Sequence, residues 1–139
     1  MKRILVIDGQ GGRLGRQLVK DIAERWPQCE LMAVGTNSIA AENMLKAGAA
    51  RAATGENAAI VACRRADIIL GPIGIVLADG LLGEVTPEMA RAVGQSAAFR
   101  ILIPSDRCET WVAGVPQGGM SALVEDALEK LAALLARGD

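Results

Sequence analysis

The sequence contains no histidine and no tyrosine, and these absences limit the chemistry that the protein can perform. Without histidine there is no Ser-His or Cys-His couple, no imidazole metal ligand and no side chain whose unperturbed pKa lies near neutrality. The three cysteines, Cys29, Cys63 and Cys108, are odd in number and far apart, a pattern of neither a disulfide framework nor a zinc site. We therefore expect reduced thiols and no bound metal.

Aromatic residues and a surplus of positive charge are also missing. The aromatic residues are Trp26, Phe99 and Trp111, and 15 Lys plus Arg balance 16 Asp plus Glu. Nucleic-acid binding needs a basic face or an aromatic stacking platform, so no nucleic-acid partner is expected. The apolar run near the N-terminus is too short for a signal peptide, and charged residues and proline interrupt the later ones. These features predict a soluble cytoplasmic protein with no membrane partner.

Short apolar runs alternate with segments of helical periodicity along all 139 residues. The runs that predict strands are residues 4–7, 31–34, 51–53, 67–70, 100–103 and 110–115. The segments that predict helices are residues 14–26, 38–46, 56–65 and 86–94, followed by a last helix that begins near Met120. Such alternation favours a parallel sheet covered on both faces. We predict an α/β fold: a single-domain Rossmann-like three-layer sandwich over residues 1–139, with a mostly parallel sheet of five to six strands.

A glycine-rich turn follows the first predicted strand, and its spacing is that of a dinucleotide fingerprint. An early glycine permits the sharp turn into the helix, Gly11 or Gly12 lets the backbone approach a pyrophosphate, and Gly15 lets the helix pack against the sheet. The helix N-terminus would favour the phosphate electrostatically. The alternative is a tight turn that binds nothing. The residues assigned to phosphate binding are Gly9, Gln10, Gly11, Gly12, Arg13, Leu14 and Gly15.

Two other glycine fingerprints fit this turn less well. No glycine stands five residues before Gly15 and no lysine follows it, so the spacing excludes a P-loop. A loop that binds S-adenosylmethionine would place a glycine at the position of Gln10. That assignment is weakened and stays open.

The other predicted strand ends are also polar or rich in glycine, and parallel strands bring them to one edge of the sheet. At the second strand end an acidic residue would normally hold the ribose of NAD, whereas this sequence has Thr36 and Asn37. Their hydroxyl and amide groups can donate to a 2′-phosphate, so we predict NADP in preference to NAD. The further cofactor-binding residues predicted at these ends are Thr36, Asn37, Ser38, Gly71, Pro72 and Ile73.

Few titratable residues fall near this predicted rim. Glu56, Asp106 and Cys108 are the candidate catalytic residues, and Arg107 could lower the pKa of the Cys108 thiol. Lys46 also falls near the rim. The simpler interpretation is that Asp106 and Arg107 form a local ion pair. The apolar, glycine-containing segment at residues 73–82 fits a lid and a subunit contact equally well.

The segment IDGQGGRLGRQLV resembles the cofactor-binding segment of the dihydrodipicolinate reductases, which bind NAD(P)H. This resemblance implies that Gly9, Gly12 and Gly15 form a phosphate turn with Arg13 beside the phosphates. The catalytic segment of that family contains paired histidines and a lysine in a second domain. This chain has no histidine and no room for that domain, so the reductase activity does not transfer.

A longer resemblance is to a family of short bacterial proteins known only as a domain of unknown function. It runs through IDGQGG, AVGTNSIA, MLKAGA, ATGEN, ADIILGPIGIV, GEVTPEMA and ILIPSDRC. It implies a Rossmann-like fold and no particular activity.

The function predicted from the sequence is therefore nucleotide or dinucleotide binding, with NADP(H) as the ligand and no reaction assigned. The alternative is a non-enzymatic module that senses a small ligand or forms homo-oligomers. Whether the protein is an enzyme stays open at this point.

Overall fold

The computed structural model describes residues 1–105, 109–115 and 119–137, and these residues contain one five-stranded sheet. The strands are β1 (Arg3–Asp8), β2 (Glu30–Gly35), β3 (Arg51–Thr54), β4 (Ile68–Pro72) and β5 (Phe99–Ile103). All neighbouring strands are parallel, in the order β3-β2-β1-β4-β5. The predicted α/β, Rossmann-like fold is confirmed.

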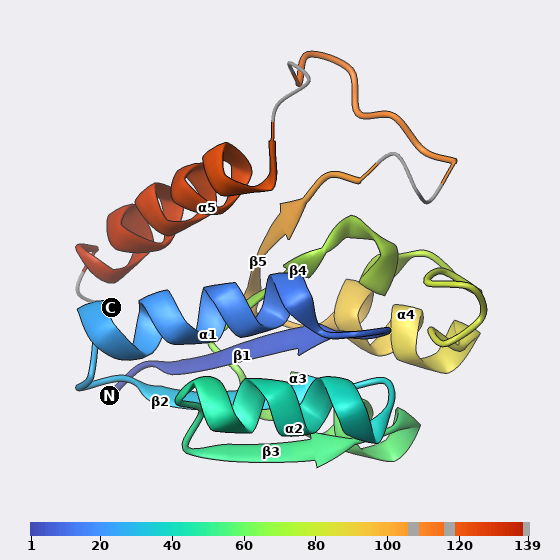
Figure 1. Ribbon diagram of the computed structural model, residues 1–139, viewed down its shortest axis with the longest axis horizontal. Helices are drawn as coiled ribbons and strands as arrows, with labels where there is room; N and C mark the ends of the chain where they lie inside the picture. Colours follow the sequence, from blue (N-terminus) through green and yellow to red (C-terminus); the bar gives the residue numbers. More distant parts are fainter. Residues whose placement is uncertain (106–108, 116–118, 138–139) are drawn as a thin grey trace.

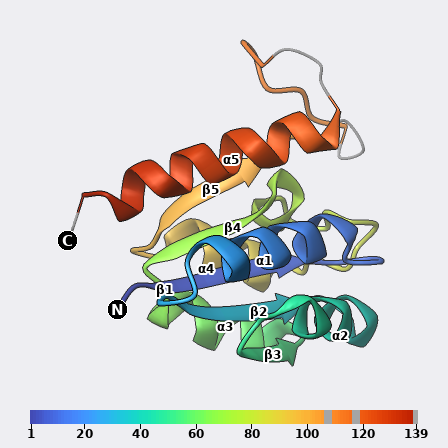
Figure 2. The same ribbon diagram turned by 60° about the vertical axis from the view of Figure 1, so that its left-hand side comes forward.

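Helices cover both faces of this sheet and complete three layers (Figures 1 and 2). On one face lie α1 (Arg13–Arg25), α2 (Ser38–Ala47) and α5 (Met120–Leu135), and on the other lie α3 (Glu56–Arg65) and α4 (Pro87–Gln95). A short 3-10 helix, η1 (Ile73–Val76), follows β4 directly. None of the helices in the described ranges combines the length and apolarity needed to cross a bilayer.

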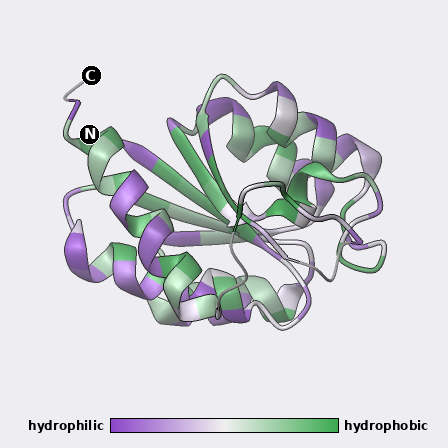
Figure 3. Ribbon diagram, turned by 90° about the horizontal axis from the view of Figure 1, so that it is seen from above, coloured by the Kyte–Doolittle hydropathy of each residue, from purple (hydrophilic) through white to green (hydrophobic). Residues whose placement is uncertain are grey.

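The central strand β1 shows why the sequence pattern works. Ile4 and Val6 face α1 and α5, whereas Leu5 and Ile7 face α3 and α4. All four are at most 2% exposed, because successive side chains of a strand point to opposite faces and here both faces are covered. Apolar residues gather along the strands and on the inner sides of the helices in Figure 3.

Local capping signals set two of the helix starts. The Asn37 side chain accepts a hydrogen bond from the Ala40 N–H at the start of α2, and the Thr86 hydroxyl accepts one from the Met89 N–H at the start of α4. Pro87 supplies a fixed φ in the first turn of α4. Both starts agree with the predicted boundaries.

The sixth predicted strand, at residues 110–115, is wrong. Within the described part of the chain this segment pairs with no strand, and β5 is an edge strand of the sheet. The Val115 N–H bonds to the Val112 carbonyl and Gly114 has a φ of 84°, so the segment curls back on itself. Its apolar residues are consequently exposed rather than packed in a ladder.

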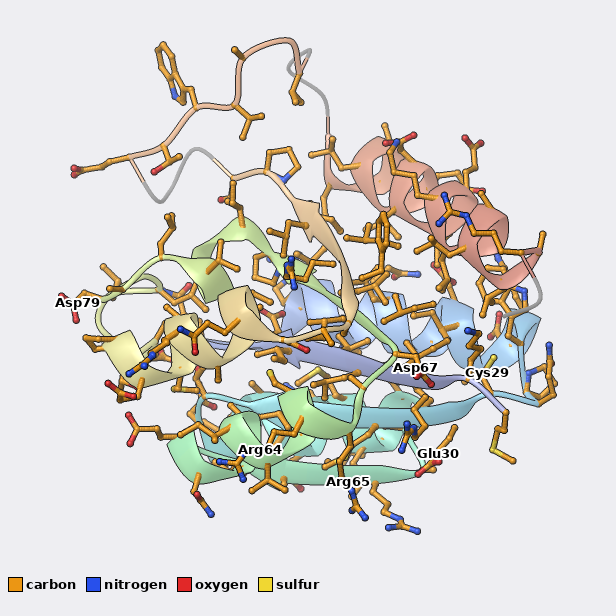
Figure 4. The ribbon with its side chains drawn as sticks, turned by 180° about the vertical axis from the view of Figure 1, so that it is seen from behind. Cys29, Glu30, Arg64, Arg65, Asp67 and Asp79 are labelled. Atoms are coloured by element: carbon orange, nitrogen blue, oxygen red, sulfur yellow. The ribbon has the colours of Figure 1, made fainter. Side chains whose placement is uncertain are left out.

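The strand order reverses between β1 and β4, and the carboxyl ends of these two strands come very close. A Cβ atom on Gly71 would lie 2.3 Å from the Ile7 carbonyl oxygen, so only glycine fits there. In open α/β sheets ligands bind beside such a reversal, outside the carboxyl ends of the strands. In Figure 4 the loop that carries Asp79 marks this edge of the sheet, and Glu30 and Asp67 lie toward the opposite edge.

Candidate functional site

A cleft of about 1110 Å³ opens at the carboxyl edge beside the reversal in strand order. This volume slightly exceeds the range of roughly 300–1,000 Å³ that is typical of small-molecule sites. The glycine turn forms one part of its lining, and the rest comes from the ends of β4 and β5, the loop before α4, residues 110–115 and the start of α5. Its described lining residues are Asp8, Gly9, Gln10, Gly11, Gly12, Arg13, Leu14, Pro72, Leu81, Leu82, Ile103, Pro104, Ser105, Thr110, Trp111, Val112, Ala113, Val115, Met120 and Leu123.

The glycine turn packs tightly against α2. Gly12 caps the N-terminus of α1 in the left-handed conformation, with a φ of 70°, and a Cβ atom there would lie 2.8 Å from Ala40 Cα. The Gly12 N–H donates to the Gly9 carbonyl at 2.8 Å, and Asn43 Nδ2 donates to the Gly11 carbonyl at 2.9 Å. Contacts with α2 therefore fix the position of the turn.

The buried side chain of Asp8 also stabilises the glycine turn. It is 5% exposed, and it is the one buried charged side chain in the part of the chain that the structure describes. Its Oδ1 accepts from the Gly9 N–H at 2.8 Å, and its Oδ2 accepts from the Gly15 N–H at 2.7 Å. Burial raises the pKa of Asp8, the bonds from Gly15 and Gly9 oppose this, and the charge of Glu84 adds to it.

The start of α1 lines the cleft and brings backbone N–H donors to it. Because Asp8 takes the Gly15 N–H, the N–H groups of Gly11, Arg13 and Leu14 are those without a hydrogen-bond acceptor among the described residues. Arg13 is exposed and lines the cleft. Free N–H groups, the helix dipole and a guanidinium together favour an anion at this point.

Glu84, in the loop before α4, also fixes the position of the glycine turn. Its Oε1 accepts from the Gln10 N–H at 2.8 Å, from Thr36 Oγ1 at 2.6 Å and from Asn37 Nδ2 at 2.8 Å. Burial opposes ionisation of Glu84, but the bonds from Thr36, Gln10 and Asn37 outweigh it and lower the pKa of this carboxyl group. One carboxylate thus ties the turn to the end of β2.

This arrangement corrects the prediction of NADP as cofactor. Thr36 and Asn37 were expected to donate to a 2′-phosphate, and both instead donate to the carboxylate of Glu84. The negative charge of Glu84 therefore lies beside the two groups that were expected to bind the phosphate, and it would repel that phosphate. NADP is the wrong ligand for this strand end.

The cleft contains only some of the residues predicted for cofactor binding. Gly9, Gln10, Gly11, Gly12, Arg13, Leu14 and Pro72 line it, whereas Gly15, Thr36, Asn37, Ser38, Gly71 and Ile73 do not. Gly15 serves packing, because a Cβ atom there would lie 2.6 Å from Met44 Sδ.

Of the three candidate catalytic residues, the structure describes Glu56. Glu56 lies outside the cleft and accepts a hydrogen bond of 2.5 Å from Thr86 Oγ1. Asp106, Arg107 and Cys108 lie outside the described residues. Lys46 was expected near the rim, but it stands in the last turn of α2, away from the carboxyl edge, where it pairs with Glu42 at 3.2 Å.

Sequence reasoning assigned no site role to Asp8, Glu84 and Trp111. Asp8 could have been found, because it ends a buried strand directly before the glycines. Glu84 and Trp111 could not, because they come from loops remote in sequence from the glycine turn. Leu81 and Leu82 have φ values of 55° and 57°, a left-handed conformation that leucine rarely adopts. Both leucines belong to the 73–82 segment, for which the sequence left a lid and a subunit contact open, and both line the cleft.

The fold and the cleft define a Rossmann-like α/β protein with a glycine turn at the reversal of strand order. The chain belongs to the family described as "Domain of unknown function (DUF3842)", which matches residues 3–136. No curated protein matches it in sequence.

Among solved structures, the chain is similar to one described as a dodecameric FMN-dependent Ubix-like decarboxylase from Escherichia coli O157:H7. The identity is 20%, the TM-score is 0.48, and the match covers 95% of this chain and 76% of that chain. The cofactor that this description names is FMN, not NADP.

Proposed function

We propose that this protein binds a mononucleotide, with its single phosphate on the glycine turn and the rest of the ligand along the cleft. The observation that carries the proposal is the position of the free donors. The N–H groups of Gly11, Arg13 and Leu14 and the Arg13 side chain are at one end of a cleft whose remaining lining is largely apolar.

A ligand with one phosphate group fits this cleft better than a dinucleotide. A dinucleotide would place its second nucleotide over the end of β2. There Glu84 takes the donors of Thr36 and Asn37, and neither of these two residues lines the cleft. The cleft extends instead over the ends of β4 and β5 toward α5.

The proposal is for binding, with no reaction assigned. In the described lining, the ionisable side chains are Asp8 and Arg13. Asp8 already accepts two N–H groups, and Arg13 is exposed. Both are used here to build and complement a phosphate site.

The experiment is a calorimetric titration with AMP and FMN on wild type and on Gly11→Asp. A Cβ atom on Gly11 meets nothing closer than Arg13 Cγ at 4.0 Å, so this variant should fold while placing a carboxylate beside the phosphate. We expect it to lose at least tenfold in affinity, about 1.4 kcal/mol. The matched control is Gly94→Asp, since Gly94 is exposed in α4 with open space around it. If neither nucleotide binds wild type, or if both glycine variants bind equally well, the proposal is wrong.

A further inference from the structure

We infer that Trp111 stacks on the ring of the bound ligand, so that the cleft selects a phosphate ester carrying a flat aromatic ring. This inference rests on the proposed function. It assigns a ligand group to the apolar part of the cleft, whereas the glycine turn would bind the phosphate. It also gives a use to the apolar segment at residues 110–115, which joins none of the described strands.

Trp111 has an exposure that core packing does not explain. It is 84% exposed, yet it lines the cleft. The protein has three aromatic residues and a core made of aliphatic side chains, so an aromatic residue is scarce here. Residues 109–115, the orange segment between the two grey traces of Figures 1 and 2, stand out beyond the start of α5. A large exposed apolar side chain on a cleft is a mark of a binding surface.

A second loop adds to the same apolar lining. Leu82 is 94% exposed and lines the cleft together with Leu81. Both leucines are held at positive φ by a turn in which the Asp79 N–H donates to the Val85 carbonyl and the Val85 N–H donates to the Gly80 carbonyl. Strained backbone of this kind is unfavourable and persists where the surrounding structure enforces it, often at ligand sites.

The composition of the lining points to the ligand. Val112, Val115 and Met120 add further partly exposed apolar surface, whereas the donors and Arg13 belong to the glycine turn. A tryptophan face attracts flat conjugated rings by stacking, which is stronger than its attraction to aliphatic chains of equal area. A ligand with a phosphate at one end and a flat ring at the other matches both parts of this cleft.

The test uses four probes that separate the ring from the phosphate. FMN has both, riboflavin has the ring alone, ribose 5-phosphate has the phosphate alone, and AMP is a second ring with a phosphate. Each is titrated into wild type, Trp111→Ala, Trp111→Phe and the control Phe99→Ala. Phe99 is exposed but does not line the cleft. Thermal melting checks that every variant folds, and flavin fluorescence reports stacking directly.

We expect Trp111→Ala to weaken FMN, AMP and riboflavin by roughly 10-fold to 100-fold, since stacking on an aromatic side chain contributes about 1–3 kcal/mol. Ribose 5-phosphate should bind Trp111→Ala as it binds wild type. Trp111→Phe should keep most of the affinity, and Phe99→Ala should keep all of it. Flavin fluorescence should be quenched on binding to wild type and regained in Trp111→Ala.

The failures of the two proposals are distinguishable. If FMN binds wild type and Trp111→Ala equally, the inference is overturned while the phosphate site stands. If Trp111→Ala weakens ribose 5-phosphate as much as FMN, the side chain acts on the turn and not on a ring, which also overturns it. If sedimentation shows that Trp111→Ala changes the oligomeric state and leaves FMN affinity unchanged, the surface joins copies of the chain. If no probe binds wild type, the proposed function itself fails.

Discussion

The hydroxyl of Thr36 donates a hydrogen bond of 2.6 Å to the carboxylate of Glu84, a residue 48 positions further along the chain. The same carboxylate oxygen accepts the Gln10 N–H of the glycine turn. The ends of β1 and β2 and the loop before α4 therefore form one hydrogen-bonded unit, and its strength can be measured.

Replacing Glu84 by alanine should destabilise the fold by about 2 kcal/mol, because three partly buried donors lose a charged acceptor. Urea unfolding gives the difference. The exposed Glu129→Ala is the control and should change the free energy of unfolding by less than about 0.5 kcal/mol. Equal effects of the two substitutions would mean that the Glu84 bonds contribute nothing.

Replacing Glu84 by glutamine should alter the pH dependence of stability. The pKa of Glu84 is lowered in the folded state from 4.5, so its stabilising effect is present above pH 4.5 and is lost as the pH falls through the folded value. Wild type should consequently exceed Glu84→Gln in stability at pH 7, and the gap should close in acid. A gap that stays constant from pH 7 to acid would contradict the assigned hydrogen bonds.

Substitution by alanine should affect the stability of the fold differently at Gly11 and at Gly12, the two adjacent glycines of the turn. Gly12→Ala should cost about 2 kcal/mol, because the residue has a positive φ and its new Cβ atom would press on Ala40. Gly11→Ala should stay within about 0.5 kcal/mol of wild type, since its Cβ atom enters open space. Thermal and urea unfolding test the pair, and equal costs at both positions would refute the assigned backbone conformation.

The thiol of Cys63 should be inert in the folded protein. Burial raises its pKa to about 11, and the side chain is 2% exposed, so neither thiolate nor access is available at pH 8. Mass spectrometry of iodoacetamide-treated protein should show labelling of Cys63 only in urea. The half-buried Cys29 provides an internal comparison and should be modified faster. Rapid labelling of Cys63 without denaturant would contradict its burial on the core side of α3.

The sheet and its helices follow from local patterns in the sequence. Residues 4–7 form a continuous apolar run because β1 is buried on both faces, and Asn37, Thr86 and Pro87 mark helix starts through contacts made within a few residues. The segment at 110–115 carries the same kind of apolar signal but pairs with none of the strands in the described part of the chain. Apolar character alone does not distinguish a strand from the lining of a cleft.

The site was predictable only where it is local. The spacing of the glycines predicts the turn. The contact between Glu84 and Gln10 joins residues 74 positions apart, so only the tertiary structure shows it. The left-handed conformations of Leu81 and Leu82 have no signal, because leucine is a residue for which they are rare. The NADP prediction is wrong because of a contact that is remote in sequence. The fold brings Glu84 to Thr36 and Asn37, and its carboxylate accepts the hydrogen bonds that these side chains donate.

The bonds from Glu84, Asn43 and Asp8 to the glycine turn have a consequence for the rate and heat of ligand binding. These polar groups satisfy the turn from within the chain itself, so the turn keeps its shape through bonds inside the protein. Association then requires little ordering of the backbone, and the entropy lost on binding comes mainly from the ligand and from the side chains that close on it. A turn built in this way should capture a phosphate at a rate limited by encounter rather than by rearrangement of the protein.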